Sequence, residues 1–511
     1  MADLSVEVHD GPVVQAVKFV RTYWPLLLPA FLIFRFLCYR YASPLRQYPG
    51  PFLASGSRLW KVWSTYSGNT ETDHILLHEQ YGPIVRIAPN EVSFSSPYAA
   101  REVLAAGKGF HKTDFYSVFP PAENPDIFTE TNEHAHSLKK RYASNAYSMA
   151  SMQNLSSYIE DTQRLLASKL DQKCISPEQT CDLGDWLHFF AFDVLGEVAF
   201  SRKFGFLESG CDLEGAIKTI DDVQWYDGII GQIPEWDLVF RRNPLAKFLP
   251  GMDPSKSLIT RMALEELSAR KNYGEKVIDR KDLLSQLMAA NEKVPENFKE
   301  GDVFAIAHGA IFAGSDSTAS TMQSFCHHVL REPSIHARLR EEIDAAVAAG
   351  SLGQFPQWNE VQALPYFQAC LKEAMRVRPA VGLNITRQVP PQGAEIGGKK
   401  FPGGTRVAVN GWVLHRNEEV FGAEPKVFRP ERWLEGDAKN MERYMFQFGG
   451  GSHLCIGKNL ALLEMNKTLP LLFRDYDLEL FEPQKDLQYH STFFVVQHGL
   501  NVRISRRGSR N

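Results

Sequence analysis

The sequence has few cysteines for its length, and their spacing is irregular. Seven cysteines are scattered over 511 residues, and no two of them form a Cys-x-x-Cys pair. An odd number at irregular spacing argues against a disulfide framework and against a zinc ribbon, and it favours a reducing compartment. The chain also lacks a long basic run, and its net charge is only −4. Because nucleic acids are bound by clustered positive charge, no nucleic-acid partner is expected.

No internal repeat or low-complexity tract is visible, and a hydrophobic content of 44% is sufficient for a large core. From about residue 130 to 345 the pattern is mostly helical, whereas the Gly-, Pro- and Val-rich stretch after Pro379 predicts short strands and turns. IVRIAPNEVSFSS, from Ile84, predicts a small hairpin that turns at Pro89 and Asn90. The sequence therefore predicts a mainly α fold with a small β component (α+β), in one catalytic domain over residues 53–511.

An uncharged apolar stretch, YWPLLLPAFLIF, lies near the N-terminus and is interrupted by Arg35. If Arg35 extends toward the interface, residues 23–41 are long enough to span a bilayer. No small-x-small cleavage site follows, which argues against a signal peptide. The alternative is a buried or interfacial helix, since the stretch contains two prolines. We expect a tail (1–22), a single membrane anchor helix (23–41) and a stiff proline-rich hinge (42–52), with the arginines after the anchor favouring a cytosolic body.

Residues 303–331 predict a long buried helix with Asp316 as its only carboxylate. Gly309 and Gly314 allow a close approach to its backbone or a local opening. Ser317 and Thr318 can donate to carbonyls four residues earlier. A satisfied core aspartate is one reading; delivery of protons to a dry site is the other.

KEAMRVRP places Glu373 and Arg376 one helical turn apart, and FRPERW supplies Arg432 in a proline-bearing loop. We expect the arginine fork of Arg432 to reach Glu373, with two unrelated surface pairs as the alternative.

The stretch FGGGSHLCIG places Cys455 among glycines just before a helical pattern. Unpaired amides and the dipole of a helix N-terminus favour a thiolate there. A single cysteine cannot hold an iron–sulfur cluster or a structural zinc, but it can be the axial ligand of a haem. A nucleophilic cysteine with His453 as its base is the alternative.

In this order, AGSDST, Glu-x-x-Arg, FRPERW and Phe-x-x-Gly-x-His-x-Cys-x-Gly resemble the motifs of the cytochrome P450 haem-thiolate monooxygenases. The resemblance covers about residues 49–503. YGPIVRIAPNEVSFS, GFLESG, RPAVGL and CIGKNLALLEM look most like fungal members of the endoplasmic-reticulum type that are akin to pisatin demethylase.

The resemblance implies the cytochrome P450 fold and a role for each motif residue. Cys455 would ligate the iron of haem b, while Glu373, Arg376 and Arg432 would support the haem pocket. Asp316 with Ser317, or with Thr318 beside it, would relay protons to dioxygen. The implied contacts of the haem propionates are His136, Lys140 or Arg141, Arg387 and His453. The family usually has arginine at the position of His453 and threonine at that of Ser317.

The resemblance also implies partners and a setting. Electrons would come from NADPH through NADPH-cytochrome P450 reductase, and a small lipophilic substrate would be oxidised at the endoplasmic-reticulum membrane. The substrate-contact segments would be 110–119, 304–313, 380–383 and 492–495. Fungal secondary-metabolite biosynthesis, of a terpenoid or polyketide for example, is the expected setting. The alternatives are detoxification of a xenobiotic or phytoalexin, and an atypical haem-thiolate isomerase or dehydratase that needs no reductase.

Overall fold

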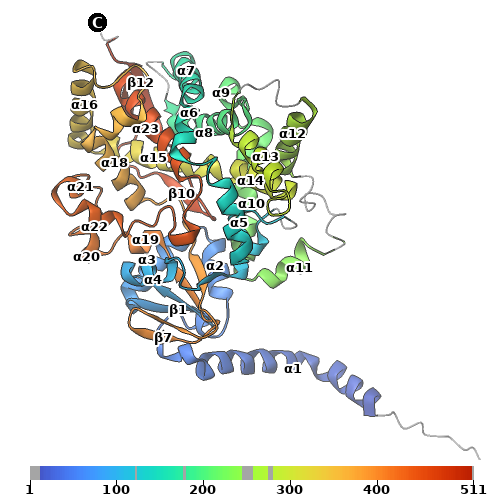
Figure 1. Ribbon diagram of the computed structural model, residues 1–511. Helices are drawn as coiled ribbons and strands as arrows, with labels where there is room; N and C mark the ends of the chain where they lie inside the picture. The colour runs from blue at the N-terminus through green and yellow to red at the C-terminus, as the bar shows by residue number, and fades with distance from the viewer. Residues whose placement is uncertain are drawn as a thin grey trace, which may run out of the picture.

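The computed structural model describes residues 12–120, 124–175, 180–243, 245, 257–273 and 280–508. A large helical body carries small sheets, and helix α1 (Pro12–Ala42) leads away from the end of the body where β1 and β7 lie (Figure 1). The expected mainly α fold with a small β component is confirmed. The helices that build the body are α2 (Leu59–Tyr66), α3 (Thr70–Tyr81), α4 (Pro97–Leu104), α5 (Glu133–Ala143), α6 (Met149–Asn154), α7 (Ser156–Lys173), α8 (Leu183–Phe200), α9 (Phe206–Ser209), α10 (Ala216–Ile230), α11 (Asp237–Phe240), α12 (Leu258–Tyr273), α13 (Leu283–Lys293), α14 (Glu300–Gly314), α15 (Asp316–Arg331), α16 (Pro333–Ala348), α17 (Trp358–Gln362), α18 (Pro365–Val377), α19 (Gly411–Leu414), α20 (Glu418–Phe421), α21 (Arg432–Glu435), α22 (Ala438–Glu442) and α23 (Lys458–Asp475).

A five-stranded sheet has the strand order β1-β2-β8-β5-β3. Its strands are β1 (Ile84–Ala88), β2 (Glu91–Phe94), β3 (His111–Lys112), β5 (Ile385–Gln388) and β8 (Arg406–Val409). β1 and β2 pair antiparallel, so the hairpin predicted from alternation is confirmed, and β2 pairs parallel with β8 from far along the chain. The smaller sheets are β10 (Gln488–Ser491) with β11 (Val495–His498), β6 (Ala394–Ile396) with β7 (Lys399–Phe401), and β4 (Cys181–Asp182), β12 (Asn501–Arg506) and β9 (Tyr476–Leu480) in that order.

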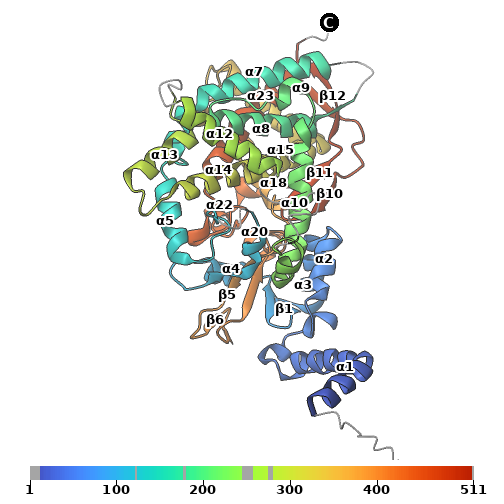
Figure 2. The ribbon, with the colours of Figure 1, turned by 90° about the vertical axis from the view of Figure 1, so that its right-hand side faces the viewer.

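The core is built around α8 and α15, which pack on each other and on α7, α14 and α18 (Figure 2). From Phe189 to Phe200 every residue of α8 is buried, so this part of the helix has no solvent face. The predicted helix over residues 303–331 is divided at Ser315 into α14 and α15. The local opening follows from the hydroxyls of Ser317 and Thr318, which donate to the carbonyls of Ala313 and Gly314 at 3.1 Å, as expected.

Helix α1 extends further toward the N-terminus than the expected anchor. The expected span was 23–41, but α1 begins at Pro12 and continues through Pro25 and Pro29. Neither glycine nor an internal proline interrupts residues 13–22, and Pro12 stands in the first turn, where a proline is tolerated, so nothing in the sequence requires the helix to begin at Tyr23. Residues 1–11 of the expected tail lie outside the described residues. Within α1, the segment Val17–Ala42 is long and apolar enough to cross a membrane, and none of it is buried against the body.

The cysteine pattern needs one correction. Cys174 and Cys181 form a disulfide with a Cα–Cα distance of 5.2 Å, although the scattered spacing predicted no disulfide framework. They come together because one follows the end of α7 and the other begins β4. The other five cysteines are free.

Candidate active site

Cys455 lies two residues before Gly457, the N-cap of α23, as the sequence predicted. Its amide donates to the carbonyl of Phe448 at 2.8 Å, which closes the glycine-rich loop. Gly451 has φ +59°, and a Cβ there would collide with the carbonyl oxygen of Leu104. A side chain at that position would therefore displace the loop from α4.

The sulfur of Cys455 faces a polar backbone environment. Burial raises the pKa of the thiol, whereas the N–H groups of Gly457 and Lys458 and the charge of Lys140 act in the opposite direction. These are the groups that stabilise a thiolate at a helix N-terminus. The side chain is surrounded by protein and still has accessible surface, so a ligand can reach the sulfur.

Glu373 is the centre of a buried ion network that supports this region. Arg376 binds it with two hydrogen bonds of 2.7 and 2.8 Å, and Arg432 donates its Nε to the same carboxylate at 2.9 Å. All three side chains are at most 2% exposed. Burial alone would raise the pKa of Glu373, but the two guanidinium groups outweigh it and hold that pKa below its usual value. The expected bridge between the two motifs is present, and the alternative of separate surface pairs is excluded.

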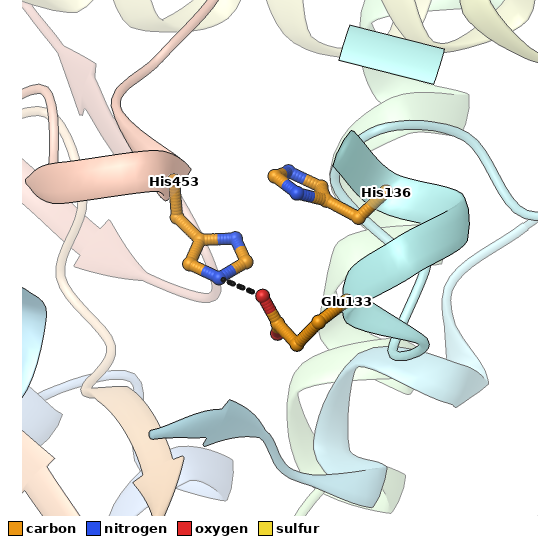
Figure 3. Close-up of side chains that lie close together, drawn as sticks. All are labelled: Glu133, His136 and His453. Atoms are coloured by element: carbon orange, nitrogen blue, oxygen red, sulfur yellow. Dashed lines mark hydrogen bonds and ion pairs between the residues drawn. The ribbon is translucent and has the colours of Figure 1, made fainter. Parts of the chain in front are cut away.

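A basic cluster lies next to the cysteine loop (Figure 3). His453 and Glu133 form a hydrogen bond of 3.1 Å, and the imidazole of His136 lies 4.3 Å from that of His453 between ring centres. Burial and the nearby charges of Lys112, Lys140 and Arg387 lower the pKa of His136 to about 3. Figure 3 shows both imidazoles and the carboxylate directed toward one another.

The charge around this cluster favours an anionic ligand over a cation. The ligand atoms of Glu133, His136 and His453 lie within 4.8 Å of one another, a spacing that also suits a metal ion. However, the lysines and the arginine just named would repel a divalent cation from this position. The Nδ1 atom of His453 and the Oε1 atom of Glu133 are buried without a hydrogen-bond partner. The charges of Lys112, Lys140 and Arg387 suit a ligand with carboxylate groups, such as the two propionates of a haem, whereas Oε1 of Glu133 is an acceptor that such a ligand cannot satisfy.

The other residues expected to contact the propionates are Arg387, Lys140 and Arg141, and they differ in burial and in hydrogen-bond partners. Arg387 is buried on β5 and donates to the hydroxyl of Tyr116 at 2.8 Å, and Lys140 donates to the carbonyls of Ser452 and Leu454. Arg141 is exposed, and its guanidinium lies over the ring of Tyr142.

Lys112 was not predicted from the sequence. It is buried on β3, where burial and the charge of Arg387 lower its pKa to about 7. The expected substrate-contact segment 110–119 includes Lys112, but the sequence did not indicate that this lysine lies in the basic cluster. Only the pairing of β3 with β5 brings it beside Arg387.

Asp316 is buried at the start of α15, and both of its carboxylate oxygens are hydrogen-bonded. Oδ1 lies 2.8 Å from Nε2 of His188 on α8, and Oδ2 accepts from Gln224 on α10 at 3.1 Å. The side chain of His188 is 13% exposed, so it connects the buried acid to the protein surface. Neither partner was predicted, because α8 and α10 are remote in sequence.

The glycines of α14 are approached by side chains. A Cβ at Gly309 would collide with the carboxylate of Asp126, and one at Gly314 would lie 3.1 Å from Leu195. The close approach expected at these glycines is therefore made by protein groups.

His308, which the sequence left as a core histidine or a substrate contact, is 1% exposed, and burial lowers its pKa to about 4.

The segments expected to contact substrate come together in an aromatic cluster. Phe115, Phe119, Phe128 and Phe493 have ring centres 5.0–6.5 Å apart where they contact one another. Phe312 of α14 packs against the same cluster. The expected segments 110–119, 304–313, 380–383 and 492–495 therefore all contribute to one apolar cluster, which Phe128 joins from outside them.

Comparisons with known proteins agree with this geometry. The sequence profile of the family Cytochrome P450 matches residues 49–504. Cytochrome P450 monooxygenase cicH of Emericella nidulans is 36% identical over 479 residues, which cover 92% of this chain and 95% of that protein. Cytochrome P450 monooxygenase gsfF of Penicillium aethiopicum is 33% identical over 497 residues, covering 94% and 97%. Pisatin demethylase of Fusarium vanettenii is 32% identical over 464 residues, covering 89% and 88%. With the profile spanning nearly the whole body and relatives matched over most of both chains, the protein belongs to the cytochrome P450 family and is a cytochrome P450 monooxygenase.

Proposed function

We propose that Cys455 is the axial ligand of a haem b with which this monooxygenase oxidises a small lipophilic molecule. The observation that carries the proposal is the accessible thiol at the N-terminus of α23, with the amides of Gly457 and Lys458 directed at its sulfur. The bound haem supplies the iron at which dioxygen is activated. The protein supplies the thiolate and the amides that stabilise its charge.

The basic cluster would hold the two carboxylates of this haem. Arg387, Lys112 and Lys140 supply positive charge, and His136 and His453 supply imidazole nitrogens for hydrogen bonds. Arg141 takes no part in this set, since it lies over Tyr142 on the exposed side of α5. Charge-assisted hydrogen bonds of this kind fix the orientation of a ligand as well as its affinity.

Asp316 would carry protons from the protein surface to the break between α14 and α15. Support for this role comes from the 2.8 Å contact between its Oδ1 and Nε2 of His188, which is itself partly exposed. The hydroxyls of Ser317 and Thr318 donate to backbone carbonyls, so their oxygen lone pairs remain able to accept a proton-bearing group. A buried acid linked to solvent through a histidine suits general acid catalysis.

The setting is a fungal endoplasmic-reticulum membrane, with α1 as a single-pass anchor and the body in the cytosol. NADPH-cytochrome P450 reductase provides the electrons, and secondary-metabolite biosynthesis is the pathway class. The apolar exposed helix α1, the aromatic cluster and the fungal sources of the relatives support this assignment. Pisatin demethylase among the relatives makes detoxification the second candidate. NADPH oxidation coupled to dioxygen uptake, only with reductase present, would exclude an isomerase or dehydratase that works without it.

The first test is the carbon monoxide difference spectrum of the reduced protein and of Cys455→Ala. The proposal predicts a strongly red-shifted Soret band in the native protein and its loss in the variant, since only a thiolate ligand gives this shift. The matched control is Cys370→Ala, which removes a buried free cysteine on α18. A red-shifted band that survives in Cys455→Ala would refute the assignment of the ligand.

The second test is Asp316→Asn, which keeps the shape of the side chain and removes its proton. If Asp316 acts as a general acid, turnover falls by roughly 10²–10⁴-fold, while the carbon monoxide spectrum is unchanged. Ser317→Ala and Thr318→Ala identify which hydroxyl contributes. Normal turnover in Asp316→Asn would show that the aspartate is only a structural partner of His188 and Gln224.

A further inference from the structure

A basic pocket lies where α1 joins the body. It has a volume of about 540 Å³ and is lined by Arg40 and Arg46 from the end of α1 and the hinge, and by Arg86 from β1. Tyr48 and Ser55 also line it. Among the described residues that line the pocket, none is acidic. Three arginines without a lining carboxylate make this a site for an anion.

Arg86 is the buried member of this basic pocket. It is 2% exposed, and its Nη2 donates to the carbonyls of Tyr39 and Pro89 at 2.8 and 2.7 Å. Its Nε atom is buried without a partner, and no carboxylate in the described part of the chain forms an ion pair with it. Burial and the charge of Arg40 lower the pKa of Arg86. A buried cation that lacks an anionic partner is costly, so a bound anion would stabilise this arrangement.

Arg40 and Arg46 are more accessible than Arg86. Arg40 donates to the hydroxyl of Ser55 at 2.7 Å and lies over the ring of Phe52 at 4.6 Å, and its Nε atom has no partner. Arg46 is exposed, and Nη1 of its guanidinium donates a long hydrogen bond of 3.4 Å to the carbonyl of Tyr41. Both guanidinium groups therefore have donors free for an incoming anion.

The surroundings identify the anion as a lipid headgroup. The pocket lies at the body end of the candidate membrane span Val17–Ala42, which is the level of the bilayer surface if α1 is inserted. Beside the pocket, an apolar surface is exposed on the loop before α2 and on α2, where Phe52, Leu53, Leu59, Trp63 and Tyr66 are 41–68% exposed. Exposed aromatic and apolar side chains next to basic ones are typical of a membrane interface. A soluble phosphate would leave this apolar surface without a partner.

We propose that this basic pocket binds the phosphate of an anionic membrane phospholipid and so fixes the angle between the anchor and the body. The proposal rests on the membrane anchoring proposed above. Arg86 already ties the last turn of α1 to the body through the carbonyl of Tyr39, so an anion held by Arg40, Arg46 and Arg86 would clamp both parts.

The test uses the full-length holoenzyme in nanodiscs of phosphatidylcholine with increasing fractions of phosphatidylserine. Native mass spectrometry counts the phosphatidylserine molecules that remain bound after release. The pocket variant is Arg40→Gln/Arg46→Gln, which spares the buried Arg86 and its structural hydrogen bonds. The control variant is Arg21→Gln/Arg35→Gln, which removes the same charge from α1, away from the pocket.

We expect the native protein and the control to retain phosphatidylserine selectively. Each pocket arginine removed should raise the apparent dissociation constant roughly fivefold, because a basic residue near an anionic surface contributes ~1 kcal/mol. The proposal would be overturned if the native protein retained phosphatidylcholine as well as phosphatidylserine, or if the control variant lost as much phosphatidylserine as the pocket variant. It would also be overturned if inorganic phosphate bound the pocket as tightly as phosphatidylserine and displaced it. Anchoring is scored separately as carbonate-resistant association with phosphatidylcholine vesicles. If the native protein does not associate with these vesicles, the anchor itself is refuted. If it associates with them but shows no preference for phosphatidylserine, only the pocket is refuted.

Discussion

The substitution Glu373→Gln tests how much the buried ion network contributes to stability. The carboxylate of Glu373 accepts five hydrogen bonds of 2.7–2.9 Å, two from Arg376 and one each from Arg432, the amide of Arg429 and the indole of Trp433. Glutamine keeps the shape of the side chain but presents an NH₂ group to donors on one side. At least two of these donors would then lose their acceptor, and two buried guanidinium groups would lose their counter-ion.

The expected cost is about 3–5 kcal/mol, the range measured when one partner of a buried ion pair is removed. Hydrogen bonds to charged groups contribute about 1.5–3 kcal/mol each, so the loss of two gives a similar figure. This is a large part of the roughly 5–15 kcal/mol by which domains are stable. The assay is urea unfolding of the holoenzyme, followed by far-UV circular dichroism and by the Soret band. We expect both transitions to move to lower urea concentration together.

The control is Glu442→Gln, which breaks the 2.6 Å pair with Lys372 on the same helix, α18, as Glu373. The side chains of Glu442 and Lys372 are 47% and 34% exposed, so breaking this pair should lower the free energy of unfolding by only about 0–1 kcal/mol. If Glu373→Gln costs no more than this control, the network does not support the fold, and the reasoning from burial is wrong.

Two further predictions concern acid stability and the cysteine loop. Burial lowers the pKa of His415 to about 3, below the ~6.5 of an unfolded chain, so the unfolded state takes up a proton first as pH falls. Stability is therefore lost as pH falls from 6.5 toward 3, and His415→Gln should remove up to about 1.4 kcal/mol per pH unit from the slope of unfolding free energy against pH, measured by urea unfolding. Gly451→Ala should lower haem content and the intensity of the red-shifted carbon monoxide band, since its Cβ would collide with the carbonyl of Leu104 at a positive φ.

Each of these has a matched control. His134 is an exposed histidine, and His134→Gln should leave the slope against pH unchanged. Gly398 has φ +72° with nothing within 4 Å of its Cβ position, so Gly398→Ala bears the cost of the dihedral angle without a collision. If the slope of unfolding free energy against pH is the same for His415→Gln and the native protein, the argument from the buried histidine is wrong. If Gly451→Ala and Gly398→Ala contain the same amount of haem, the argument from the collision with Leu104 is wrong.

The sequence predicted those parts of the site that depend on local pattern. The glycine-rich loop and the helical spacing after it placed Cys455 at a helix N-terminus, because glycine and capping rules act over a few residues. The bridge from Arg432 to Glu373 was also predicted, since an arginine fork suits a carboxylate and the order of the motifs favoured the pairing. The helix break at Ser315 was anticipated only as a local opening, because the hydroxyls indicate bending but not its position.

Other parts of the site depend on contacts between remote segments, which local pattern does not encode. His188 and Gln224 reach Asp316 from helices that are 128 and 92 residues away in sequence. Neither residue stands in a motif, and a lone histidine on an apolar helix usually indicates core packing. Cys174 and Cys181 are only seven residues apart, and the spacing of the cysteines alone did not indicate that they form a disulfide.

The replacement of the usual arginine by His453 changes where positive charge is held. Burial and the charges of Arg387 and Lys112 lower the pKa of His453 to about 2, so its imidazole is neutral at physiological pH before a carboxylate binds. Positive charge must then come from those two residues and from Lys140, which reach the cluster from β5, β3 and α5. A bound carboxylate would raise the pKa of His453, but from a value far below neutrality. The substitution therefore moves the charge from the cysteine loop to the surrounding elements. The neutral imidazole of His453 has a single N–H, which donates to Glu133 from Nε2, so His453 would donate to a haem propionate only by exchanging Glu133 for it.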